Sequence, residues 1–381
     1  MRAAFAALVI CCAVQPPIAS AQVVSADVQV ESYSLGSSED LSLSSVRLMT
    51  LQFGAQARIA PGLALAVLGG YADAEAGLGN GAKTALNGPV DTRVSVEVRG
   101  NGLHLTASAL LPTGDVAKTT TDATVVGLLS TDLLPFTVSH WGRGGGFAGD
   151  VGYRLRPGSI ALELSVGGSY LGESTVQVAG PLTYRPGREF RARGSIEAGV
   201  GSGGVLSVLF GYQNFGSDIY GEVDVFRPAS RIEGVASLAF PLGARESTLT
   251  YAGLYRLASA DLPPGMGVDP ALPPSIAGVG GRASRMLFLA GTEMRFGRGA
   301  YSLVPRGDLR VLRNEEGVGQ GWVASLGGRV EFEEIATLLG QRVLFAPRAQ
   351  IHVGRLVASQ GVRSSVLGLD VGVVTYWGGG R

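Results

Sequence analysis

Cysteine, lysine and long apolar runs are scarce in this chain of 381 residues. Both cysteines, Cys11 and Cys12, lie near the N-terminus, so the rest of the chain can form neither a disulfide framework nor a thiolate metal site. Lysine occurs only at Lys83 and Lys118, and the formal net charge is zero, so no nucleic-acid partner is expected. No run of about twenty apolar residues follows the first segment, so no transmembrane helix is expected.

The first residues are typical of a secretory signal peptide. Arg2 precedes the apolar run 3–14, which is too short to span a bilayer, and residues 19–21 read Ala-Ser-Ala, a small-x-small cleavage site. We therefore predict a signal peptide over 1–21 and one mature domain over 22–381. An exported chain rich in apolar residues but without a spanning helix must place its apolar surface in a protein core or in lipid.

Segments of about ten residues alternate apolar and polar side chains along the mature chain. Since successive side chains of a strand point to opposite faces, each segment is predicted to be a two-faced strand. A soluble β-sandwich gives the same alternation, so the period alone leaves two folds open. Clear examples of the apolar face are Val94, Val96 and Val98, then Ile160, Leu162 and Leu164, then Met286, Phe288 and Ala290.

The connections between these segments alternate in length, and that second rhythm favours a membrane barrel. Long loops are uncommon in compact soluble domains, whereas outer-membrane barrels carry them on one side only. Short turns are predicted at Pro61-Gly62, Gly100-Asn101, Pro157-Gly158, Gly201 to Gly204, Leu242 to Glu246 and Gly297 to Gly299, with one helical turn over Glu333 to Gln341. Long connections are predicted at 76–89, 112–142, 172–186, 215–228, 259–281, 312–320 and 354–362.

These patterns predict an all-β fold, a transmembrane antiparallel up-and-down β-barrel of about sixteen strands, from near Val23 to near Trp377. Fourteen strands is the alternative count. Aromatic residues at both ends of the strands are expected to form two girdles at the lipid–water boundaries. The girdle candidates are Tyr71, Tyr153, Tyr170, Phe240, Tyr255, Phe296, Trp322, Phe332 and Trp377.

The pattern as a whole resembles that of bacterial outer-membrane porins and channels over the full mature length. A narrower likeness at Leu111–Asp115 and Gly144–Tyr153 is similar to barrels associated with uptake of aromatic or other hydrophobic compounds. The last segment resembles the final strand of outer-membrane proteins, but it departs from that pattern by ending in Gly378–Arg381 instead of an aromatic residue. The resemblance implies a bacterial outer-membrane location, with outer-membrane lipid and the barrel-assembly machinery as partners and a homo-oligomer as an open alternative.

Arginines fall on the polar faces of many segments. An arginine facing lipid at mid-depth costs roughly 2–4 kcal/mol, so in a barrel these residues should face a wet lumen. They either pair with carboxylates across strands as a structural ladder or form a positive wall that biases permeation towards anions. The lumen candidates are Arg58, Arg93, Arg99, Arg154, Arg191, Arg193, Arg306, Arg310, Arg329 and Arg348.

The connection 112–142 combines charges with an apolar stretch. Its constriction candidates are Asp115, Lys118, Asp122 and Asp132. Because apolar side chains left in water are unfavourable, we expect the loop to fold inward and narrow the lumen. The alternative is an outer lid with no role in transport.

Catalytic and metal-binding signatures are lacking. The histidines His104, His140 and His352 show no metal-ligand spacing, and the glycine motif at 199–204 precedes a strand, so it predicts a hairpin turn. We therefore expect no metal, no cofactor and no enzyme. The predicted function is a passive channel for small solutes through a charged, arginine-rich lumen narrowed by loop 112–142. The alternatives are a non-conducting structural or adhesin barrel and a secreted soluble β-protein.

Overall fold

The structure is a computed structural model, and it describes most of the chain from Gln22 onward. The described residues are 22–36, 43–78, 81–114, 118–119, 125, 133–134, 136, 144–177, 181–227, 230–257, 285–314, 319–338, 341–357 and 363–378. The predicted signal peptide lies outside them.

Sixteen antiparallel strands form a closed barrel in which β1 pairs with both β2 and β21. Closure pairs the backbone of every strand on both sides, as a lipid environment requires. The strands are β1 (Gln22–Leu35), β2 (Leu43–Ala60), β3 (Leu63–Leu78), β4 (Lys83–Gly100), β5 (Leu103–Leu111), β7 (Gly146–Leu155), β8 (Ile160–Leu171), β11 (Glu189–Val200), β12 (Gly204–Phe215), β15 (Arg231–Pro241), β16 (Glu246–Leu257), β17 (Arg285–Arg298), β18 (Tyr301–Asn314), β19 (Gly319–Leu338), β20 (Gln341–Val357) and β21 (Arg363–Gly378). The predicted strand count and both ends of the barrel are confirmed.

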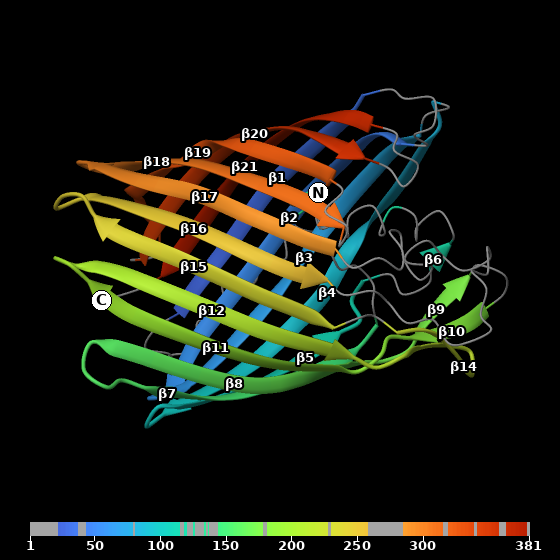
Figure 1. The fold of residues 1–381 in the computed structure, drawn as a ribbon, viewed down its shortest axis with the longest axis horizontal. Coiled ribbons are helices and arrows are strands. Elements are labelled where there is room, and N and C mark those ends of the chain that lie inside the picture. The colour runs from blue at the N-terminus through green and yellow to red at the C-terminus, as the bar shows by residue number, and fades with distance from the viewer. Residues whose placement is uncertain are drawn as a thin grey trace.

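Short turns gather at one end of the barrel, here called the inner end, and longer connections at the other, the outer end (Figure 1). Gly62, Gly158 and Gly201 have φ of 76°, 65° and 58°, and Asn101 has φ of 50°, so tight hairpin turns occur where the sequence predicts them. Two predictions of connections were wrong. Strand structure occupies most of the predicted connection 76–89, since β3 runs to Leu78 and β4 begins at Lys83. β19 runs to Leu338 where a helical turn was expected.

Apolar side chains face outward and charged ones face the interior. The outward Leu162 and Phe288 are 37% and 41% exposed. Val94 pairs with the apolar Val67 and Ala109, in the same outward set, whereas Arg93, Glu163 and Glu293 occupy the opposite, inward positions. A soluble sandwich would bury the apolar face instead, so this orientation identifies a transmembrane β-barrel.

Most of the girdle candidates face outward, but the prediction was wrong for Tyr255. Tyr255 pairs with Glu233 and Leu287, which face the lumen. The outward positions next to them are occupied by the pair Leu254 and Phe288. The other eight candidates occupy outward register positions. At the inner end, the Phe332 ring lies 6.5 Å from Tyr301 and 6.3 Å from Phe345 between centroids, which links three neighbouring strands.

A second, five-stranded sheet lies at the outer end, built from connections between barrel strands (Figure 1). Its strands, in spatial order, are β14 (Val223–Phe226), β13 (Asp218–Tyr220), β10 (Pro181–Arg185), β9 (Ser174–Gln177) and β6 (Lys118–Thr119). The buried Asp218 carboxylate accepts hydrogen bonds from the Tyr184 hydroxyl and the Gly187 amide, both at 2.6 Å, which joins two of the connections. Among the described residues, no helix is long and apolar enough to cross a membrane.

Candidate permeation pathway

The inward faces of the strands carry arginines and carboxylates in matching numbers. The inward arginines among the described residues are Arg58, Arg93, Arg99, Arg154, Arg191, Arg193, Arg231, Arg295, Arg306, Arg310, Arg329 and Arg348. The inward carboxylates are Asp27, Glu31, Glu97, Asp150, Glu163, Glu189, Glu197, Glu233, Glu293, Asp308, Glu331 and Asp370. The barrel interior is therefore charged but close to neutral overall.

On β17–β19 the charges form a cross-strand network. The Arg329 guanidinium donates to both Glu293 oxygens at 2.9 Å and to Glu331 at 2.6 Å. Arg295 adds a second contact to Glu331 at 2.7 Å. One carboxylate thus joins two arginines, which gives this part of the wall the ladder arrangement.

A similar network lies on β7, β8 and β11. Arg191 donates to both oxygens of Asp150, and its guanidinium lies 3.6 Å from Glu189. Arg154 pairs with Glu197 and lies 3.8 Å from Glu163. Bidentate arginine–carboxylate pairs are among the stronger charged contacts in proteins, so these arginines hold neighbouring strands together.

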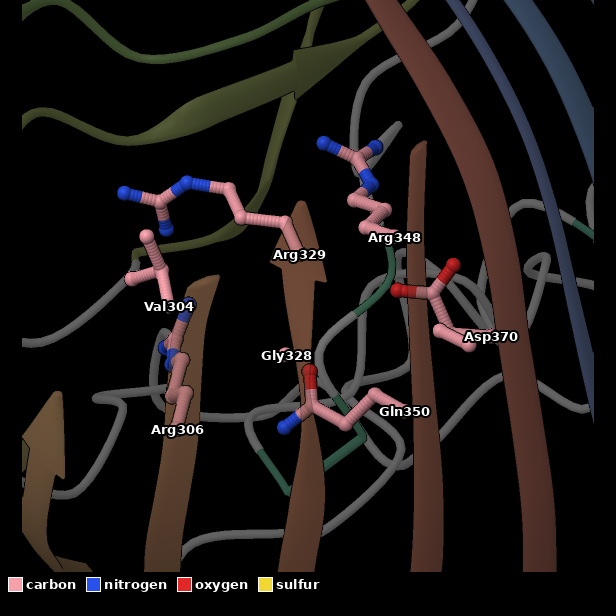
Figure 2. Close-up of a pocket in the computed structure, with 8 residues that line it drawn as sticks. Val304, Arg306, Gly328, Arg329, Arg348, Gln350 and Asp370 are labelled. Atoms are coloured by element: carbon pink, nitrogen blue, oxygen red, sulfur yellow. The ribbon is translucent and has the colours of Figure 1, made fainter. Parts of the chain in front are cut away.

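Between β18 and β21 the wall contains a hollow (Figure 2). Arg306, Arg329 and Arg348 project from three neighbouring strands around it, with Gln350 and Asp370 on the side of β20 and β21. Arg348 donates to both Asp27 oxygens, at 3.1 and 3.0 Å, and to Gln29.

Asp308, two residues after Arg306 on β18, lies near two arginines. Its oxygens lie 3.6 Å from Arg306 and 3.8 Å from Arg310, while Gln350 donates to it at 3.1 Å. The Arg306 guanidinium also contacts the Tyr251 hydroxyl at 3.3 Å. Neither Arg306 nor Arg310 makes a close hydrogen bond to Asp308, and among the described residues the Nε atoms of both arginines are buried without a hydrogen-bond partner.

Two lumen candidates differ from the rest. Arg58 and Arg93 are exposed to the lumen, and neither contacts a carboxylate within the part of the chain that the structure describes. Arg99 contacts Glu97 on its own strand, and Arg193 lies 3.5 Å from Glu233. Arg231, whose guanidinium lies over the Phe215 ring, likewise has no carboxylate contact among the described residues.

An apolar segment of the 112–142 connection packs inside the barrel. Val125, Leu133, Leu134 and Phe136 are buried, and the Phe136 ring lies edge-on to Tyr33 with centroids 5.1 Å apart. We call this set the inner plug because it lies inside the barrel, and it is not part of the inner end defined above. Its wall partners face inward from the outer parts of β1–β4 and β18–β21 and are Tyr33, Leu35, Val46, Leu48, Ala72, Ala74, Ala76, Leu86, Val90, Leu312, Val323 and Val366.

Sequence reasoning missed these wall partners because it assigned every inward face to polar residues. A signal was present: Leu48-Met49 is apolar on both faces, and Ala72, Ala74 and Ala76 share one face. Strands that are apolar on both faces are buried on both, here by lipid outside and by the inner plug inside.

Several predicted site residues lie outside the described residues. These are Asp115, Asp122 and Asp132, the side chain of Lys118, and His140. Lys118 itself belongs to β6, which pairs in parallel with β9 in the outer sheet. Among the described residues, no group of histidine, cysteine and carboxylate side chains has the geometry of a metal site.

The two other histidines lie within the barrel wall. His104 Nε2 lies 3.7 Å from Glu163. The buried His352 makes a 2.9 Å hydrogen bond through Nδ1 with the Ser325 hydroxyl.

The Pro-Thr-Gly motif after β5 has a structural contact on β4. The Thr113 hydroxyl donates to the Val90 carbonyl and accepts from the Thr92 amide, both at 2.9 Å. Asp91 accepts from the Gly114 amide at 3.0 Å. The motif thus anchors the start of the long connection to β4, next to the register shift that β3 and β4 show at Leu68–Gly70.

No protein-family model matches this chain, and no curated protein matches it in sequence. Solved outer-membrane barrels are similar to it in architecture. A bacterial polysaccharide outer membrane secretin is 10% identical, with a TM-score of 0.47 and coverage of 93% of this chain and 98% of the other. The CymD monoaromatic hydrocarbon channel is 10% identical (TM-score 0.41, coverage 95% and 89%), and an anion-selective porin from Comamonas acidovorans is 12% identical (TM-score 0.42, coverage 93% and 98%).

Proposed function

We propose that this protein is a passive channel for small polar solutes in the bacterial outer membrane and not an enzyme. The proposal rests chiefly on the inward wall of charged side chains. Barrels of sixteen strands are wide enough to leave an aqueous channel. A wall of ion pairs suits water and polar solutes, because burying so many charges in a dry core would be strongly unfavourable.

The charge pattern supports weak selectivity among solutes. Most inward arginines contact a carboxylate, so the lumen presents alternating charges to a passing molecule. Arg58 and Arg93 add a modest preference for anions, since each leaves a positive charge without a carboxylate contact among the described residues. The inner plug narrows the lumen from the side of β1–β4 and β18–β21.

Liposome swelling tests the proposal directly. The folded protein, reconstituted in phosphatidylcholine liposomes, should admit a pentose faster than a disaccharide, because the plug limits the width. Heat-denatured protein is the control for leakage. Swelling no faster than that control would refute a channel.

The non-conducting barrel is the second candidate, and the inner plug is the observation that favours it. If the plug and the outer sheet close the lumen completely, neither sugar enters. A variant lacking residues 119–134 then separates the two functions. Entry only after the deletion would indicate a barrel closed by its own loop, whereas no entry in either form would indicate a structural barrel.

A further inference from the structure

Arginines also lie on the outward face, at the outer end of the barrel. Arg313 of β18, Arg355 of β20 and Arg363 of β21 occupy outward register positions and are exposed. Arg355 lies directly opposite the outward Trp322 on β19. These three side chains therefore lie near the lipid boundary and do not line the lumen.

Charge on the outward face differs between the two ends. On the described strands, the outward charges at the inner end are Glu246 and Arg298, one of each sign. At the outer end the further outward charges are Arg47, Asp73, Glu75, Lys83, Arg188 and Arg256, and Glu75 pairs with Lys83 at 2.7 Å. The outer end of the lipid-facing surface is thus strongly positive.

The spacing of the three arginines fits a ligand with more than one anionic group. Ser365 lies opposite Arg355, so Arg363, two residues further along, is a diagonal neighbour about 7–8 Å away between Cα atoms. Arg313 lies two strands from Arg355, on the other side of Trp322. Within the described part of the chain none of the three contacts a carboxylate.

We propose that Arg313, Arg355 and Arg363 form a docking surface for the phosphate groups of an anionic, phosphorylated lipid headgroup. Guanidinium groups match phosphate geometry and bind it through paired hydrogen bonds. At the boundary of the apolar band, a lipid phosphate supplies the counter-charge while its chains lie along the outward leucines and valines. The partner is therefore a lipid of the leaflet at the outer end.

Native mass spectrometry of the detergent-solubilised full chain tests this surface, with bisphosphorylated lipid A and its dephosphorylated form as probes. Replacing all three residues (Arg313→Gln, Arg355→Gln and Arg363→Gln) should weaken binding of the bisphosphorylated probe at least tenfold, about 1.4 kcal/mol. Binding of the dephosphorylated probe should not change. Arg298→Gln, the outward arginine of the inner end, is the matched control and should leave both unchanged.

Three outcomes would overturn the proposal: equal affinity of wild type and triple variant, equal binding of both probes by wild type, or full displacement by inorganic phosphate, which indicates a free-phosphate site. If the glutamine variant does not fold, the three arginines are replaced by lysine. A triple lysine variant that keeps the preference for the phosphorylated probe supports the surface. A folded triple lysine variant that loses this preference, while Arg298→Lys keeps it, overturns the proposal. Pentose entry into liposomes should be unaffected in every variant, so failure here is distinct from failure of the channel proposal.

Discussion

Replacing Phe136 by alanine should release the inner plug and widen the channel without unfolding the barrel. Phe136 is 9% exposed and packs edge-on against Tyr33, whereas the barrel strands are held by their own ladders and ion pairs. The substitution therefore acts on docking of the loop, not on closure of the barrel.

The magnitude follows from the buried side chains. Removing a buried phenylalanine ring typically costs 3–5 kcal/mol. Burial of the plug residues contributes about 1.5–3 kcal/mol each, and ordering the backbone costs about 1–2 kcal/mol per residue. The net docking energy is then small, and a loss of about 3 kcal/mol shifts the docked population more than a hundredfold.

Single-channel recording in planar bilayers measures this shift. We expect Phe136→Ala to show a larger conductance for most of the recording time. Phe147→Ala is the matched control, because Phe147 faces outward with 70% exposure and touches no plug residue. A Phe136→Ala protein with wild-type thermal stability and an unchanged conductance distribution would refute the reasoning.

Three further predictions test the wall, the turns and the lipid face. Arg93→Glu should make the channel more cation-selective: the reversal potential in a KCl gradient should shift by an amount equivalent to about 1 kcal/mol in relative permeability. Arg191→Gln should instead lower the free energy of unfolding by about 1.5–3 kcal/mol, because it leaves Asp150 unpaired. A change of selectivity with Arg191→Gln and of stability with Arg93→Glu would contradict the assignment of the two arginines. In guanidinium unfolding, Gly62→Ala should lower the free energy of unfolding more than Gly158→Ala. An added Cβ lies 2.2 Å from the Arg99 carbonyl oxygen at Gly62 and meets nothing within 4 Å at Gly158. Equal decreases would mean that the positive φ alone causes the destabilisation. Leu162→Arg should cost about 2–4 kcal/mol and Leu162→Ile little, and similar stabilities of the two variants would argue against lipid contact.

The architecture was predictable because it depends on local signals. Alternation with a period of two gives two-faced strands, and glycine with proline or asparagine marks the hairpins at Gly62, Asn101 and Gly158. The number of strands followed from counting both rhythms. The same reasoning failed at 76–89, where β3 and β4 run further than the sequence predicts and nothing local distinguishes their ends from a loop.

Within the candidate pathway, the sequence indicated which residues face inward but not what each one meets. Tyr255 was misplaced because Leu249, Tyr251 and Tyr255 share one phase of β16, which is the more apolar phase in the sequence yet faces inward. Its neighbours Glu233 and Leu287 settle the side. The pairing of Arg191 with Asp150, from β11 to β7, depends on cross-strand register over two strand steps. Register is a property of the assembled sheet, so spacing along one strand does not reveal it.

Strand rhythm and the charged residues of the inner face follow from residue order alone, because they depend on near neighbours in the chain. The balance of charge across the lumen, the seat of the plug against Tyr33, and the row of outward arginines around Trp322 follow only from closure of the ring. Closure brings residues hundreds of positions apart, such as Asp27 and Arg348, into contact, and no local pattern carries that information.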